Sequence, residues 1–285
     1  PVPSDNVSLE TFLDHFTFPL AILQDKEAIY ESMIACISDL EKDNVCYAEI
    51  RFAPQAHLLK GLTQEEAVIA CIEGVNKAKQ LYKDITVQLI LCMMCDNTGD
   101  SEVNLETARL AAKYYGQGVC ALDLAGVEGL VPYSSYKKCL SIVKEKHVPV
   151  TLHAGESGPA SHVHDALKVG ADRIGHGGHA LEDPAVIQEL LDKKVVLEQC
   201  VTSNIQCHNQ PSYELHAIRP LFDAGVKVTV NTDNRSLSGT TLQKEIDKLK
   251  KYMHFTDEEI HQMMLYAVDG AFTTEEEKER LRKLV

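Results

Sequence analysis

The chain has 285 residues and a formal net charge of −14, with 42 acidic and 28 basic side chains. Hydrophobic residues make up 45% of it, enough to bury a large core, yet no apolar run reaches the roughly 18 residues that a membrane span needs. Because an acidic surface repels phosphate backbones, we expect no nucleic-acid partner, no membrane and a small neutral ligand. The sequence does not indicate an oligomeric state.

The chain contains nine cysteines, an odd number scattered through apolar segments. This pattern is typical of reduced, buried thiols, and the first residues show no basic and then apolar targeting signal. We therefore expect a cytoplasmic protein. Cys92 and Cys95 form a CxxC, which could hold zinc, but structural zinc usually needs a second such pair. Two core cysteines are the better interpretation.

In chain order, a helix-like stretch (8–40) comes first. Apolar runs of strand length follow at 44–54, 85–94, 118–126, 148–155, 172–177, 195–201 and 226–233. Helical periodicity predicts helices at 63–82, 102–115, 134–145, 160–169, 183–192, 213–224, 241–253 and 257–271. The strands are apolar throughout, which is typical of a parallel sheet covered on both faces. Repeated strand–helix units predict one α/β domain over residues 1–285.

Two sheet architectures fit this order of elements. A doubly wound sheet would carry a Gly-rich phosphate turn after its first strand, and the sequence has no GxGxxG motif or P-loop. A (β/α)8 barrel places polar residues at the ends of many strands, which is the pattern found. We therefore predict a (β/α)8 TIM-type barrel. Only seven strands are found and closure needs another, so we interpret the first strand as upstream of Pro1 and missing from this chain.

Residues that can bind metal or move protons follow three of the predicted strands. His153 and Glu156 end the run "VPVTLHAGESG", His176 lies in "GHGGH", and Asp233 lies in "VNTDN". Because strand ends meet at one barrel mouth, we expect these side chains to lie together. Imidazole and carboxylate ligands suit zinc, which activates water, and Glu156 would then shuttle protons. The alternatives are histidines with a structural role and an N-cap role for Asp233.

Two further patterns accompany these residues. The glycines around Glu156 and His176 either let a ligand approach the backbone or form tight turns, and both interpretations stay open. His162 and His164 form an HxH pair, but at the start of a predicted helix residues i and i+2 point about 200° apart. We expect these two to be solvated helix residues rather than metal ligands.

The segments "YAEIRFAPQ", "DLAG", "TLHAGE", "RIGHGGH" and "VTVNTDN" together resemble the adenosine deaminase family of metal-dependent amidohydrolases, over nearly the whole chain. The resemblance implies a (β/α)8 barrel with one Zn²⁺ and hydrolytic deamination of adenosine or 2′-deoxyadenosine to the inosine product and ammonia. It implies that His153 and Asp233 bind zinc and that Glu156 protonates purine N1 while hydroxide attacks C6. His176 would orient or deprotonate the zinc-bound water, and the backbone N–H of Gly126 would bind purine N3.

Two features depart from the family pattern. Asn234 stands where the family typically has a second Asp facing purine N7; because an amide can donate to N7, we expect substrate binding to be retained. The family takes two more zinc ligands from an HxH on the first strand, which this chain lacks, and catalytic zinc usually needs three protein ligands. The alternatives are therefore a deaminase of adenine or another purine derivative, and an inactive fragment or purine-nucleoside-binding protein.

Overall fold

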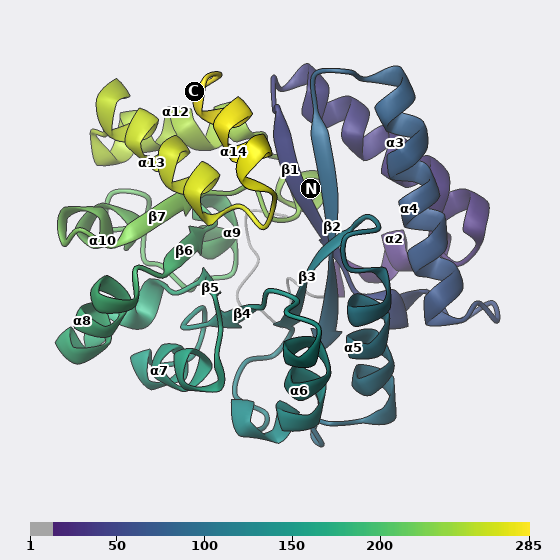
Figure 1. Cartoon of the computed structure of the whole chain (residues 1–285). Coiled ribbons are helices and arrows are strands. Elements are labelled where there is room, and N and C mark those ends of the chain that lie inside the picture. Colours follow the sequence, from purple (N-terminus) through teal and green to yellow (C-terminus); the bar gives the residue numbers. More distant parts are fainter. Residues whose placement is uncertain (1–13) are drawn as a thin grey trace. The chain divides into compact units, whose positions relative to one another are not determined.

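The computed structural model describes residues 14–285, in which parallel strands alternate with helices (Figure 1). The described residues group into two compact units. The amino-terminal unit comprises Phe16–Gly126 and Leu130–Val150, and the carboxy-terminal unit comprises Val127–Gly129 and Thr151–Val285 together with residues 14 and 15. The single domain expected from the sequence stays a prediction.

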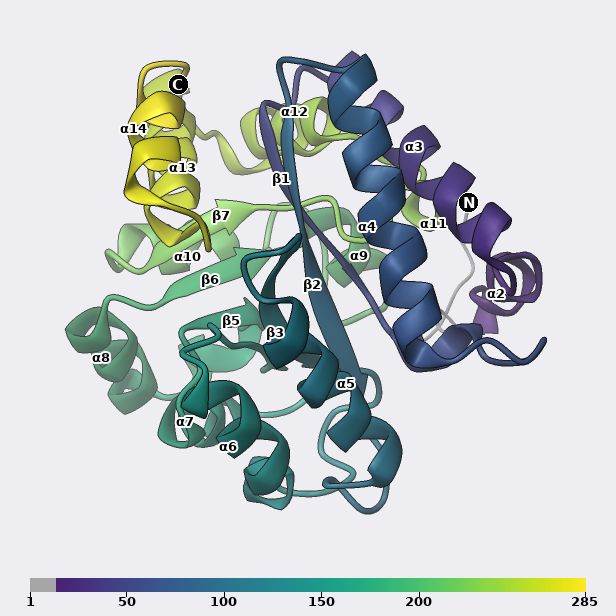
Figure 2. The ribbon, with the colours of Figure 1, turned by 45° about the vertical axis from the view of Figure 1, so that its right-hand side comes forward.

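The amino-terminal unit has a three-stranded parallel sheet in the order β1-β2-β3. Its elements are α2 (Thr17–Ile22), α3 (Lys26–Lys42), β1 (Tyr47–Phe52), η1 (Pro54–His57), α4 (Gln64–Leu81), β2 (Thr86–Met94), α5 (Glu102–Tyr114), β3 (Val119–Ala125), η2 (Tyr133–Tyr136) and α6 (Lys137–Glu145). Helices α3 and α4 run side by side (Figure 2). Helix α4 begins at a capping box, because Thr63 and Glu66 satisfy each other's backbone N–H groups.

The carboxy-terminal unit has a four-stranded parallel sheet in the order β4-β5-β6-β7. Its strands are β4 (Thr151–Ala154), β5 (Arg173–His176), β6 (Val196–Gln199) and β7 (Lys227–Val230). Its helices are α7 (Ala160–Val169), η3 (Gly178–Glu182), α8 (Pro184–Lys193), α9 (Val201–Gln206), α10 (Ile218–Asp223), α11 (Arg235–Ser238), α12 (Leu242–Met253), α13 (Asp257–Gly270) and α14 (Glu275–Arg282). Each of these strands has only four residues in the sheet. The residues that follow its carboxyl end leave the sheet directly.

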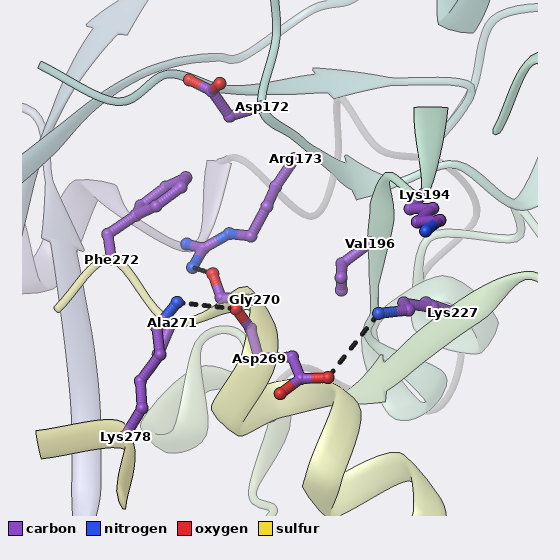
Figure 3. A pocket seen from close by; sticks show the side chains of 10 residues that line it. All are labelled: Asp172, Arg173, Lys194, Val196, Lys227, Asp269, Gly270, Ala271, Phe272 and Lys278. Atoms are coloured by element: carbon purple, nitrogen blue, oxygen red, sulfur yellow. Dashed lines mark hydrogen bonds and ion pairs between the residues drawn. The ribbon is translucent and has the colours of Figure 1, made fainter. Parts of the chain in front are cut away.

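A cavity of about 210 Å³ lies at the amino ends of β5, β6 and β7 (Figure 3). Three of its cations make polar contacts: Arg173 donates to the Gly270 carbonyl (2.9 Å), Lys227 lies 3.6 Å from Asp269, and Lys278 donates to the Asp269 carbonyl (2.8 Å). Arg173 also donates to the buried carboxylate of Glu198 at 2.7 Å. These contacts hold the start of the sheet to α13 and α14, away from the strand ends that carry the candidate site.

The structure confirms all seven predicted strands and most of the helices. The helix predicted over 213–224 is wrong at its start, because α10 begins only at Ile218. Pro220 lacks a backbone N–H and fits best in the first turn of a helix, so the helix begins just before it. The stretch predicted over 8–40 divides into α2 and α3, and its first residues lie outside the described part. Helices α9, α11 and α14 were not predicted.

Within the described residues, no helix combines the length and apolar character required to cross a membrane.

Candidate functional site

The carboxyl ends of β4 and β5 bring three of the predicted site residues together. In the sheet register Ala154 pairs with His176, and the His153 and His176 rings lie 5.1 Å apart between centroids. Glu156 follows β4 by two residues, and its Oε2 lies 3.8 Å from His176 Nε2. Both side chains of this pair are more than nine-tenths buried. A carboxyl group and an imidazole therefore face one another in a place largely closed to water.

Asp233 joins this group from the turn after β7. A ring nitrogen of His176, the Sγ of Cys200 and a carboxylate oxygen of Asp233 lie within 4.8 Å of one another. Nitrogen, sulfur and oxygen are all donors that zinc accepts, so among the described residues this set fits a metal ion. His153 is outside the set, although its ring lies against His176. The position of Asp233 beside these donors favours the metal interpretation over the N-cap.

Cys200 was not expected at the site. It lies directly after β6 and is buried, as the interpretation of the cysteines as buried thiols implies. Its place beside His176 was not predicted, and it arises because the parallel order β5-β6 sets the carboxyl ends of these two strands next to each other. The position of "EQC" after an apolar run is the signal that could have found it.

The backbone is strained at two of these residues. His176 (φ 60°) and Asp233 (φ 51°) adopt the left-handed conformation, which costs about 1–3 kcal/mol for a residue other than glycine. Such strain persists only where surrounding contacts enforce it, and it is concentrated at functional sites. Gly175 lets the His153 ring pack closely against the neighbouring strand, since an added Cβ would lie 3.0 Å from that ring. At this position close packing against His153, rather than a turn, favours glycine.

The turn that carries Glu156 is held by one buried carboxylate, Glu128. The backbone N–H groups of residues 155, 156, 157 and 158 all donate to it, at 2.7, 3.1, 3.0 and 2.9 Å. His162 Nδ1 lies 2.8 Å from the same carboxylate. Burial alone would raise the pKa of Glu128, but the backbone hydrogen bonds and His162 outweigh it, so the pKa is lowered. Glu128 thus stays ionised and fixes four consecutive peptide groups.

We expect Glu128→Gln to lower both stability and turnover, because an amide nitrogen would face backbone N–H donors. Losing hydrogen bonds to a charged group costs about 1.5–3 kcal/mol. Since the folded pKa lies below the ordinary value, the wild-type advantage is present above the unfolded pKa and disappears as the pH falls through the folded pKa. Urea unfolding across this pH range measures the gap between wild type and variant. A difference in unfolding stability between wild type and variant that grows as the pH falls would contradict the role of Glu128.

Glu128 was not predicted from the sequence, nor was its contact with His162. His162 lies on α7 as expected but is held by Glu128, so its description as solvated is wrong. His164 Nδ1 lies 2.7 Å from Glu189 and is half exposed, in line with the expectation. The two histidines therefore bond different carboxylates, as their separation of two helix positions requires.

Amide side chains surround the catalytic candidates. Asn209 Nδ2 donates to Glu156 Oε1 at 3.2 Å, and Asn204 Nδ2 lies 3.0 Å from His176 Nδ1. Asn234 Nδ2 donates to Asp233 Oδ1 at 2.7 Å, so one of its two amide protons is already used. Behind Asn204 lies His216, whose pKa is lowered to about 3 by burial and by the nearby His176. Asn204, Asn209 and His216 were missed in the sequence analysis.

Gly126, predicted to bind purine N3, directly follows β3 in the amino-terminal unit. Its φ of 105° lies in the left-handed region, which favours glycine, and an added Cβ would lie 3.2 Å from Met94 Cε. The turn after β3 therefore requires glycine whatever its role with a ligand.

Comparison with known proteins gives consistent matches. A family model described as adenosine deaminase matches residues 2–285. The adenosine deaminase of Haemophilus ducreyi is 37% identical over 285 residues, covering 98% of this chain and 82% of that protein. The crystal structure of adenine deaminase from Arthrobacter aurescens is similar with a TM-score of 0.89 at 25% identity, covering 97% of this chain and 84% of that chain. A zinc-bound amidohydrolase from Burkholderia ambifaria gives a TM-score of 0.85 at 21% identity, covering 92% and 72%.

These likenesses confirm the predicted α/β class of TIM-barrel fold. Together with the donors at the strand ends, they define a metal-dependent hydrolase of the amidohydrolase type, acting on carbon–nitrogen bonds. More particularly, the chain belongs to the adenosine deaminase family.

Proposed function

We propose that this protein catalyses the zinc-dependent hydrolytic deamination of adenosine or 2′-deoxyadenosine to inosine or 2′-deoxyinosine and ammonia. The observation that carries the proposal is the meeting of Glu156, His176 and Asp233 at the carboxyl ends of β4, β5 and β7, with His153 against the His176 ring. The identity of 37% with a curated adenosine deaminase supports the same reaction.

The donors at the strand ends would hold the zinc ion. His153 and Asp233 are the proposed ligands, and Cys200 lies within reach of Asp233 as a further donor. When bound, zinc supplies a water acidified to a pKa of about 7 for attack on the purine ring. The zinc in the Burkholderia amidohydrolase is consistent with this choice of metal.

Glu156 is the proposed acid that protonates purine N1. Its Oε1 already accepts from Asn209, so Oε2 is the oxygen left to carry the transferable proton. Protonating N1 lets the ring accept the electron pair when C6 is attacked, which makes C6 a better electrophile. His176 would orient the attacking water or take its proton, Gly126 would donate to purine N3, and Asn234 would donate to N7 through its remaining amide proton.

Adenine is the second candidate substrate, because the similar Arthrobacter structure is an adenine deaminase. Another purine derivative, such as a nucleotide, uses the same ring chemistry. A purine-nucleoside-binding protein without turnover is the non-enzymatic candidate.

The full-length protein from its own gene, loaded with zinc, should convert adenosine to inosine, which the ultraviolet spectrum and released ammonia report. Adenine and AMP, tested in parallel, decide the substrate class. If adenine or AMP is turned over and adenosine is not, that compound is the substrate instead of the nucleoside. Calorimetric binding of adenosine with no ammonia released from any of the three would identify a binding protein and refute the proposed activity.

A further inference from the structure

A chain of three hydrogen bonds leads from the backbone of α10 to His176. The Ile218 N–H donates to His216 Nδ1 (3.1 Å), and His216 Nε2 lies 3.2 Å from Asn204 Oδ1. Asn204 Nδ2 in turn lies 3.0 Å from His176 Nδ1. The three residues His216, Asn204 and His176 are only 1%, 4% and 3% exposed. Solvent therefore offers these groups no alternative partners, and they must satisfy one another.

The direction of every bond follows from the first. A backbone N–H only donates, so His216 Nδ1 must accept. The lowered pKa of His216 keeps the ring neutral, so its single proton is on Nε2 and is donated to Asn204 Oδ1. The Asn204 amide nitrogen is thereby turned toward His176 and donates to its Nδ1. An amide turned the other way would set its N–H group against the N–H of His216.

We propose that Asn204 and His216 are positioning residues that hold His176 in the tautomer with its proton on Nε2. In that tautomer His176 presents an N–H group at Nε2, the atom that lies 3.8 Å from Glu156 Oε2. It does not accept a proton at that atom, because the position is already occupied. Of the two roles left open for His176, orienting the attacking water and taking its proton, the first follows. This catalytic consequence rests on the proposed function.

The same tautomer separates His176 from the metal ligands. A histidine that binds a metal through one ring nitrogen almost always donates a hydrogen bond from the other. His176 Nδ1 instead accepts from Asn204, and Nε2 carries the proton. Although a ring nitrogen lies within 4.8 Å of donors on Cys200 and Asp233, His176 in this tautomer would act beside a bound metal ion rather than as one of its ligands.

Nitrogen-15 NMR of the histidine side chains reports the tautomer directly. In the zinc-loaded full-length protein, His176 and His216 should both show a protonated Nε2 and an unprotonated Nδ1, and His176 should keep its Nε2 proton when zinc is added to the metal-free protein. A protonated Nδ1 on His176 would overturn the proposal, as would loss of the Nε2 proton on zinc binding. This wild-type measurement decides the matter even where a variant fails to fold.

Asn204→Asp tests the relay itself, since a carboxylate accepts from both sides. His176 should switch to a protonated Nδ1 while His216 keeps its proton on Nε2. Ser203→Ala is the matched control on the same helix, because the Ser203 hydroxyl contacts Cys207 at 4.0 Å, and it should leave both histidine patterns unchanged. An unchanged His176 pattern in folded Asn204→Asp would refute the role of Asn204.

Kinetics separate this proposal from the proposed function. If adenosine is turned over, Asn204→Asp should lower kcat by about 10–100-fold, with KM nearly unchanged, because the binding surface is kept while the attacking water is no longer held in position. A purely structural role would change stability and leave kcat of the folded enzyme intact, which would overturn the catalytic consequence. If no purine is turned over, the proposed function fails, and the NMR result still decides the tautomer.

Discussion

Glu156→Gln is expected to abolish most turnover while leaving the fold and the bound zinc in place. The amide keeps the size of the side chain and can still accept from Asn209 at Oε1, but it has no acidic proton for purine N1. Loss of a positioned general acid typically costs about 10²–10⁴-fold in rate. Steady-state kcat with adenosine measures the loss of turnover. Circular dichroism measures whether the fold is kept, and metal analysis measures whether zinc is still bound.

Glu182→Gln is the matched control for this variant. Glu182 belongs to the same unit and pairs with His179, and its side chain is about half exposed. The control should turn over adenosine at the wild-type rate. A Glu156→Gln enzyme that keeps a near wild-type kcat would show that another group protonates the purine.

His153→Ala is expected to remove zinc and, with it, activity. His153 is one of the proposed protein ligands, and the remaining donors would be too few to keep the ion against dialysis. We expect the zinc affinity to fall by more than about 100-fold, beyond the usual effect of losing a residue that only supports a ligand. Atomic emission after dialysis and competition with a chromophoric chelator measure the affinity.

His164→Ala provides the control and tests the HxH pair at the same time. Because His164 contacts Glu189 and lies half exposed on α7, its loss should leave the zinc content unchanged. Zinc retained in His153→Ala but lost in His164→Ala would contradict the assignment of ligands.

The strands and the first residues beyond them were predictable from the sequence because both depend on local patterns. Continuous apolar runs indicate strands of a parallel sheet, and parallel order alone places His153 and His176 at neighbouring strand ends. The start of α10 was harder to predict, because the position of Pro220 outweighed the helical periodicity of the sequence before it.

The residues that support the site could not be predicted, because their roles arise from contacts between distant segments. Glu128 lies 27–30 residues from the peptide groups that it holds, and Asn204 lies 28 residues from His176. No spacing rule connects such pairs. The role of His216 is harder still to predict from the sequence, since it acts through Asn204 and contacts no predicted site residue in the bonds described.

The carboxylate of Glu128 accepts hydrogen bonds from main-chain N–H groups and not from the side chains of the turn, which bears on protein engineering. Ser157 contributes its N–H to the turn while its residue is exposed, so a library of side chains at position 157 would leave the anchoring peptide groups untouched. Gly158, one residue later, offers no such freedom, because an added methyl group would lie 2.7 Å from Glu128 Oε1. Of these two positions beside Glu156, residue 157 therefore accepts side-chain diversity and Gly158 does not.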